Sequence, residues 1–132
     1  MPQVSRNKSK YKGFKAFLYR FKYSFDGLVY AYKNEQSIWI HAVCSFVGII
    51  LGILLRITRT QWNILLITLA VILSIELLNT AIEAVVDMVT PEYNKLAKVA
   101  KDCGSAATFV VSITGAIISA TIFIPRIINL LS

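Results

Sequence analysis

The sequence predicts an all-α membrane protein with three transmembrane helices, preceded by an amphipathic helix at the membrane surface. Hydrophobic residues make up 56% of the 132 residues, which is more than a soluble domain of this length can shield from water. These residues gather into three long runs, and many of the basic residues precede the first run. We therefore expect one integral membrane domain over residues 1–132.

The amphipathic helix is predicted over residues 12–34. Its apolar residues recur at helical spacing and form one stripe: Phe14, Phe17, Leu18, Phe21, Phe25 and Leu28. Lysines occupy other faces, so we expect the helix to lie in the plane of the lipid headgroups. A helix packed on protein would show the same pattern. The first 35 residues are too polar to contain the apolar segment of a secretory signal.

The three apolar runs predict transmembrane spans at residues 38–55, 62–89 and 103–124. The first is near the shortest length that crosses a hydrocarbon core of about 30 Å. Pro91 ends the second run, and a polar segment follows it through Asp102. A chain with three spans has little interior of its own, so we expect it to form oligomers.

The distribution of basic residues predicts the orientation. Eleven of the fourteen Lys and Arg residues lie in the amino-terminal segment and in the 90–102 loop, which three spans place on the same side. The positive-inside rule puts that side in the cytoplasm. Because the basic segment leads directly into apolar spans, we assign it to anionic lipid and expect no nucleic-acid partner.

Acidic residues form a stripe on the second predicted span. Glu76, Glu83 and Asp87 are spaced i, i+7 and i+11, which places them within about 40° of one another on a helix. Asn79 falls about 60° to one side, and Glu76 lies roughly 16 Å below Asp87 along the axis. The stripe therefore carries acidic groups from the membrane surface towards its interior.

Charged groups at such depth are costly and are rarely kept without a partner or a task. No Lys or Arg lies in any predicted span, and we interpret His41, in the first span, as a packing or headgroup contact. A divalent cation is then the natural counter-charge, and Mg²⁺ prefers oxygen ligands completed by phosphate. Lys98 and Lys101 on the same side are suited to bind phosphates, and Glu35 lies at the membrane surface.

Two segments resemble a known family. The run Glu76-Leu-Leu-Asn-Thr-Ala-Ile-Glu83-Ala-Val-Val-Asp87 is followed by Ala100-Lys-Asp-Cys-Gly-Ser-Ala-Ala107, and upstream stand Tyr23-Ser-Phe-Asp-Gly-Leu28 and Asn34-Glu35. Together they resemble the prokaryotic diacylglycerol kinase and undecaprenol kinase family over residues 13–126. The resemblance implies a homotrimeric kinase in the bacterial cell membrane, with its active site facing the cytoplasm. Neither a P-loop nor a glycine-rich kinase loop is present in the sequence.

The resemblance also implies roles for individual residues. Glu76 matches the catalytic general base, which takes the proton of a lipid hydroxyl, and Glu35 and Glu83 match the Mg²⁺ ligands. The implied ATP-binding residues are Tyr23, Glu35, Glu83, Asp87, Lys101 and Asp102. The residues implied to lie near the lipid substrate are Glu76, Asn79 and Ser105.

The sequence leaves two lipid alcohols as candidate substrates, undecaprenol and diacylglycerol. The segment Ile122-Phe-Ile-Pro-Arg126 resembles undecaprenol kinases and favours conversion of undecaprenol to undecaprenyl phosphate. Gly104-Ser-Ala-Ala107 resembles diacylglycerol kinases, which make phosphatidic acid. Two other classes are an ion-transport protein lined by carboxylates and a non-catalytic assembly factor. The acids stop midway, and no charged residue continues the path through residues 64–75, which counts against transport.

Overall fold

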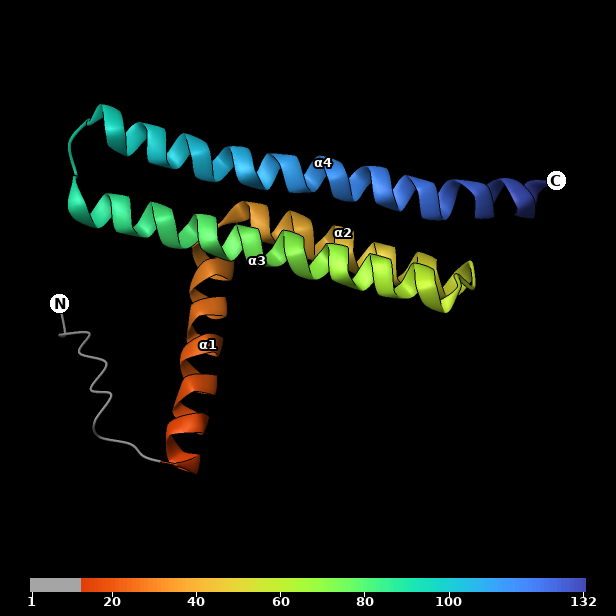
Figure 1. Ribbon diagram of the computed structural model, residues 1–132, viewed down its shortest axis with the longest axis horizontal. Coiled ribbons are helices and arrows are strands. Elements are labelled where there is room, and N and C mark those ends of the chain that lie inside the picture. Colours follow the sequence, from red (N-terminus) through yellow and green to blue (C-terminus); the bar gives the residue numbers. More distant parts are fainter. Residues whose placement is uncertain (1–12) are drawn as a thin grey trace. The chain divides into compact units, whose positions relative to one another are not determined.

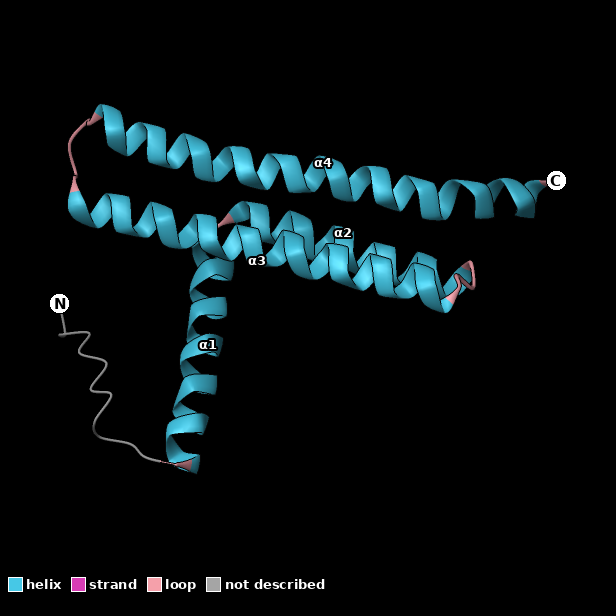
Figure 2. Ribbon diagram, viewed as in Figure 1, coloured by secondary structure: helices cyan, strands magenta, loops and turns pink. Residues whose placement is uncertain are grey.

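The structure is a computed structural model that describes residues 13–132, and the regular secondary structure of this part is entirely helical (Figures 1 and 2). The helices are α1 (Phe14–Asn34), α2 (Gln36–Leu54), α3 (Arg59–Val89) and α4 (Lys95–Leu131). Of these, α2, α3 and α4 are long and apolar enough to cross a membrane. The prediction of an all-α chain with three such helices is confirmed.

Helix α1 and the segment Glu35–Ser132 belong to two different compact units of the chain. Within α1, the predicted phenylalanine stripe is a row of ring contacts. The ring centroid of Phe17 lies 6.3 Å from that of Phe14 and 5.6 Å from that of Phe21. The location of α1 at a membrane surface remains a prediction. Residue 12 of the predicted helix and the basic residues Arg6, Lys8 and Lys10 lie outside the described residues.

The turn between α2 and α3 is set by local hydrogen bonds. Arg56 adopts a left-handed conformation with φ of 47°, and Thr58 caps α3. The Gln61 N–H donates to Thr58 Oγ1 at 3.3 Å, and the Thr58 N–H donates to Gln61 Oε1 at 2.9 Å, which is a capping box. This box begins the helix at Arg59, three residues before the predicted span.

Helix α4 is longer than the span predicted at residues 103–124. It begins at Lys95 because the Asn94 side chain accepts from the backbone N–H groups of Leu96 and Ala97, at 2.8 and 3.2 Å. It also continues past Pro125 to Leu131. The polar segment that ends at Asp102 is therefore largely helical, and its charged side chains are held at fixed positions along α4.

Helix α3 packs along α4 and also contacts α2 (Figure 1). At the end of the bundle near the α2–α3 turn, Ile57, Leu65, Ile122 and Phe123 form a buried apolar cluster. Elsewhere most apolar side chains face outwards, and only 11% to 17% of the most apolar window of each span is buried. Lipid or further copies of the chain must cover these surfaces.

Glycine allows α3 and α4 to approach closely. A Cβ atom at Gly115 would lie 2.6 Å from Ile72 Cδ1 and 3.3 Å from Thr68 Cγ2. We expect Gly115→Val to overpack this contact and to lower the free energy of unfolding by about 1–3 kcal/mol. Ala116→Val, on the exposed face of the same helix, is the matched control. Thermal unfolding in detergent measures both variants, and equal stability of the two would contradict the close contact.

Candidate functional site

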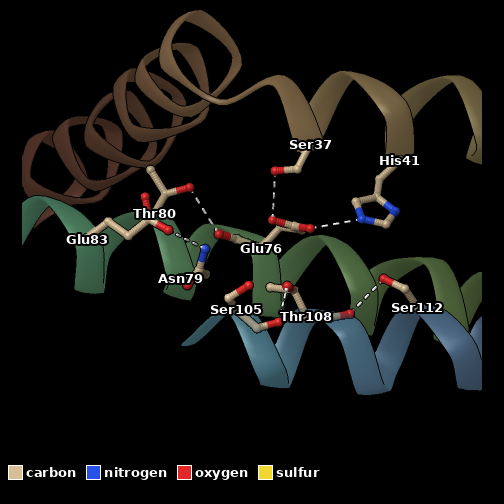
Figure 3. Close-up of polar contacts among 9 residues, drawn as sticks. All are labelled: Ser37, His41, Glu76, Asn79, Thr80, Glu83, Ser105, Thr108 and Ser112. Carbon is tan, nitrogen blue, oxygen red and sulfur yellow. Dashed lines mark hydrogen bonds and ion pairs between the residues drawn. The ribbon is translucent and has the colours of Figure 1, made fainter. Parts of the chain in front are cut away.

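The centre of the candidate site is the carboxylate of Glu76, which lies on α3 and is 3% exposed. Two side chains of α2 contact it (Figure 3). Ser37 Oγ donates to Glu76 Oε2 at 3.1 Å, and His41 Nε2 lies 2.8 Å from Glu76 Oε1. Thr80 Oγ1 donates to the backbone carbonyl of Glu76 at 3.1 Å. Both carboxylate oxygens of this deeply placed acid therefore have a partner on the neighbouring helix.

The sequence did not reveal the contacts of Ser37 and His41 with Glu76. His41 was expected to be a packing or headgroup contact, and the structure shows that it packs between helices with its imidazole against the Glu76 carboxylate. The spacing of Ser37 and His41, i and i+4, places both side chains on one face of α2, and this signal was present in the sequence. The sequence does not state which helix meets that face. His41 thus supplies a polar partner for the acid that was expected to depend on a cation alone.

Asn79, one turn along α3 from Glu76, joins the same polar stripe. Its Nδ2 donates to Glu83 Oε1 at 2.9 Å, while its buried Oδ1 has no hydrogen-bond partner among the described residues. This oxygen faces Gly104 of α4, where a Cβ atom would lie 2.3 Å from it. The absence of a side chain at Gly104 therefore leaves the space that Asn79 occupies, and Asn79 in turn orients Glu83.

Ion pairs connect the charged groups at the outer end of the stripe. Lys101 Nζ of α4 lies 2.5 Å from Asp87 Oδ1 of α3, and Lys98 Nζ lies 2.5 Å from Asp102 Oδ2 one turn along α4. Lys101 was expected in the 90–102 loop, whereas the structure places it on α4, which packs against the helix that carries the acids. Asp87 and Lys101, both predicted to bind ATP, are thus brought together.

Glu35 immediately precedes α2 and is half-buried. Desolvation by burial raises the pKa of Glu35, and the negative charges of Glu83 and Glu76 raise this pKa further, while Lys101 opposes them. Glu35 and Glu83, the two predicted metal ligands, are therefore close enough to repel each other. Among residues 13–132, no group of three or more His, Cys, Asp or Glu residues could hold a metal ion.

A pair of carboxylates nevertheless suits Mg²⁺, because this ion commonly takes one or two protein carboxylates and completes its shell with phosphate oxygens and water. A cation placed between Glu35 and Glu83 would also remove the repulsion that raises the pKa of Glu35. The donor set of the site therefore fits the expected metal in the presence of a nucleotide.

The two remaining predicted residues are Ser105 and Tyr23. Ser105 follows Gly104 on α4 and is exposed, and its backbone carbonyl accepts from Thr108 Oγ1 at 2.8 Å (Figure 3). Tyr23 lies on α1, in the other unit of the chain, and is 43% exposed. The roles assigned to Ser105 in lipid contact and to Tyr23 in ATP binding stay predictions.

Comparison with known proteins identifies the family of the chain. Residues 22–123 match the family described as prokaryotic diacylglycerol kinase, and this range contains every candidate residue from Tyr23 to Ser105. The chain belongs to this family. It is therefore a lipid kinase, and the transport and assembly alternatives are not supported.

Curated relatives carry two names. The undecaprenol kinase of Bacillus subtilis is 32% identical over 111 residues, which are 84% of this chain and 90% of that protein. The diacylglycerol kinase of Pseudomonas aeruginosa is 38% identical over 98 residues, 74% of this chain and 80% of that protein. The diacylglycerol kinase of Synechocystis is 32% identical over 115 residues, 86% of this chain, but the match spans only 66% of that longer protein.

The contact between Asn79 and Gly104 gives a test of the site. We expect Gly104→Ala to displace Asn79 and with it Glu83, and to lower kinase activity by about tenfold to a hundredfold, the order of loss that follows a ~1 Å misplacement in an active site. Cys103→Ala, an exposed change on the same helix, is the control. Phosphate transfer to lipid measures both, and wild-type activity of Gly104→Ala would contradict the arrangement.

Proposed function

We propose that the chain uses ATP and Mg²⁺ to phosphorylate the hydroxyl of a membrane lipid alcohol, and that this alcohol is undecaprenol, which becomes undecaprenyl phosphate. The observation that carries the proposal is the carboxylate of Glu76, 3% exposed on an apolar helix and followed outwards along that helix by Glu83 and Asp87. A buried group on a helix that crosses the membrane would be within reach of a lipid hydroxyl, whereas Asp87, further along the same helix, is exposed.

The proposed reaction is a direct transfer. Glu76 takes the proton of the lipid hydroxyl as the hydroxyl oxygen forms a bond to the γ-phosphorus of ATP. The bond between the γ-phosphorus and the β,γ-bridging oxygen breaks, and ADP leaves with that electron pair. The products are the lipid phosphate, ADP and a protonated Glu76, which later releases its proton.

The outer residues have the charges that the nucleotide requires. Glu35 and Glu83 would hold Mg²⁺, which would neutralise charge on the phosphates during transfer. Lys101 and Asp102 are expected to contact the nucleotide, together with Tyr23. Because Lys101 is paired with Asp87 in the structure, we expect it to exchange this carboxylate for a phosphate oxygen when ATP binds.

Two observations support undecaprenol as the substrate. The undecaprenol kinase of Bacillus subtilis matches this chain over 90% of its own length, and the segment Ile122-Phe-Ile-Pro-Arg126 resembles that branch. Diacylglycerol, which would give phosphatidic acid, is the second candidate. Gly104-Ser-Ala-Ala107 and the 38% identity to the Pseudomonas aeruginosa diacylglycerol kinase favour it.

We further propose that the protein is a homotrimer in the bacterial cell membrane, with its amino terminus and active site in the cytoplasm. The excess of Lys and Arg in the amino-terminal segment and the 90–102 loop supports this orientation. The small buried fraction of each span supports assembly, because one copy leaves most of its apolar surface uncovered by protein.

The role of Glu76 is tested with purified protein, Mg²⁺, γ-labelled ATP and either undecaprenol or dioleoylglycerol in mixed micelles. Wild-type protein is expected to transfer label to the organic phase, with undecaprenol preferred. Glu76→Gln should lower kcat by about a hundredfold or more, because a general base contributes 10²–10⁴-fold, while ATP still binds. Asp26→Asn on α1 is the control. A preference for dioleoylglycerol would select the second substrate, and label in neither lipid would exclude both.

Because the pKa of Glu35 is raised, we expect its substitution to increase the stability of the protein but to weaken its binding of Mg–ATP. When the pKa of a carboxyl group is higher in the folded than in the unfolded state, the free energy of unfolding of the protein falls as the pH rises from the unfolded to the folded pKa. This loss of stability persists at neutral pH. Glu35→Gln is therefore expected to raise the unfolding temperature of the ligand-free protein at pH 7. It should also weaken Mg–ATP binding by about tenfold, which is ~1.4 kcal/mol. Asp26→Asn should change neither quantity.

Calorimetric titration and thermal unfolding in the same detergent measure these two effects. A lower unfolding temperature together with unchanged Mg–ATP affinity would show that Glu35 has a structural role only.

A further inference from the structure

We infer that His41 is a positioning residue for Glu76: its imidazole, assisted by the Ser37 hydroxyl, holds the carboxylate in the orientation in which it receives the substrate proton. This inference rests on the proposed function of Glu76 as the general base. It starts from the 2.8 Å contact between His41 Nε2 and Glu76 Oε1 and the 3.1 Å hydrogen bond from Ser37 Oγ to Glu76 Oε2 (Figure 3).

The two contacts fix the plane of the carboxylate. Both donors come from one face of α2, and each engages a different oxygen, so rotation about the terminal bond of Glu76 would break both hydrogen bonds. A carboxylate oxygen has two acceptor positions, and one remains on each oxygen for a lipid hydroxyl. The arrangement therefore orients Glu76 without occupying the positions that the reaction needs.

Because Glu76 is buried, its Oε1 depends on His41 as a hydrogen-bond donor. The Glu76 side chain is 4% exposed, so water does not replace a lost partner readily. The nearby hydroxyl of Thr80 donates to the backbone carbonyl of Glu76, and not to its carboxylate. Helix α2 contains no other His and no Lys, Arg, Asp or Glu. An apolar side chain at position 41 would thus leave Oε1 buried without its donor.

The inference predicts an effect on turnover and not on nucleotide binding. The residues proposed to bind ATP lie on α1, at Glu35 before α2, on α3 beyond Glu76 and in the first turns of α4, whereas the contact of His41 in the structure is with Glu76. Loss of the imidazole should therefore lower kcat and leave the KM for ATP within about twofold of its wild-type value. A variant that merely loosened the fold would change both.

Three variants and a control test this inference in the micelle assay with the lipid that the wild-type protein prefers. His41→Leu removes the donor and keeps a bulky side chain; we expect kcat to fall at least tenfold, which is ~1.4 kcal/mol in the barrier. His41→Gln restores an N–H donor of similar reach and should recover most of this loss. Ser37→Ala removes the second donor and should lower kcat several-fold. Val43→Ala, on the exposed face of α2, should behave as wild type.

A double variant separates this inference from the proposed function. In the Glu76→Gln background no carboxylate remains to be oriented, so adding His41→Leu should change the residual kcat by less than about twofold. If Glu76→Gln alone keeps wild-type turnover, the proposed function fails. If Glu76→Gln is inactive but His41→Leu and Ser37→Ala turn over normally, only the positioning role fails.

Folding is monitored by size-exclusion chromatography and circular dichroism. Should His41→Leu fail to fold, His41→Gln and Ser37→Ala decide the question by their kcat values. The inference would be overturned if folded His41→Gln had no measurable kcat. It would also be overturned if Ser37→Ala changed kcat and the KM for ATP by the same factor.

Discussion

The structure depends on the burial of one carboxylate in an apolar helix. Glu76 is 3% exposed, and a carboxyl group in such a place is tolerated only where hydrogen-bond partners replace water. Ser37 and His41 supply these partners from α2, whose packing near the α2–α3 turn is made by apolar side chains. The polar contact therefore specifies which faces of α2 and α3 meet, a choice that apolar contacts alone determine weakly in lipid.

The acidic stripe of α3 forms a gradient of exposure that matches the two substrates of a lipid kinase. Glu76 is buried, Glu83 is half-buried and Asp87 is exposed. Helix α4 completes this gradient, because Gly104 leaves room for Asn79 beside Glu83, and Lys101 pairs with Asp87. Under the proposed function, the lipid hydroxyl and the phosphates of ATP would lie at different depths, and the buried and exposed groups of α3 and α4 would serve one each.

The sequence predicted what depends on local pattern. It predicted the three apolar helices, the acidic stripe and the family, because periodicity, span length and motif are properties of contiguous residues. It missed the contacts of His41 because partners across helices depend on how two faces meet. It also placed Lys101 in a loop, since hydropathy marks the apolar part of a helix and not its polar first turns, which Asn94 caps. Whether Tyr23 reaches the nucleotide depends likewise on how α1 meets the other helices.

The ionised form of Glu35 is electrostatically unfavourable in the ligand-free site. Burial and the charges of Glu83 and Glu76 all raise the pKa of Glu35, and Lys101, which is also paired with Asp87, opposes them less strongly. A bound cation would relieve this repulsion. The repulsion lowers the stability of the ligand-free protein, and its relief would add to the free energy of cation binding, so stability and binding are linked. Under the proposed function, Mg–ATP would bring the cation that relieves the repulsion between Glu35 and Glu83 and the phosphates for which Lys101 would exchange Asp87.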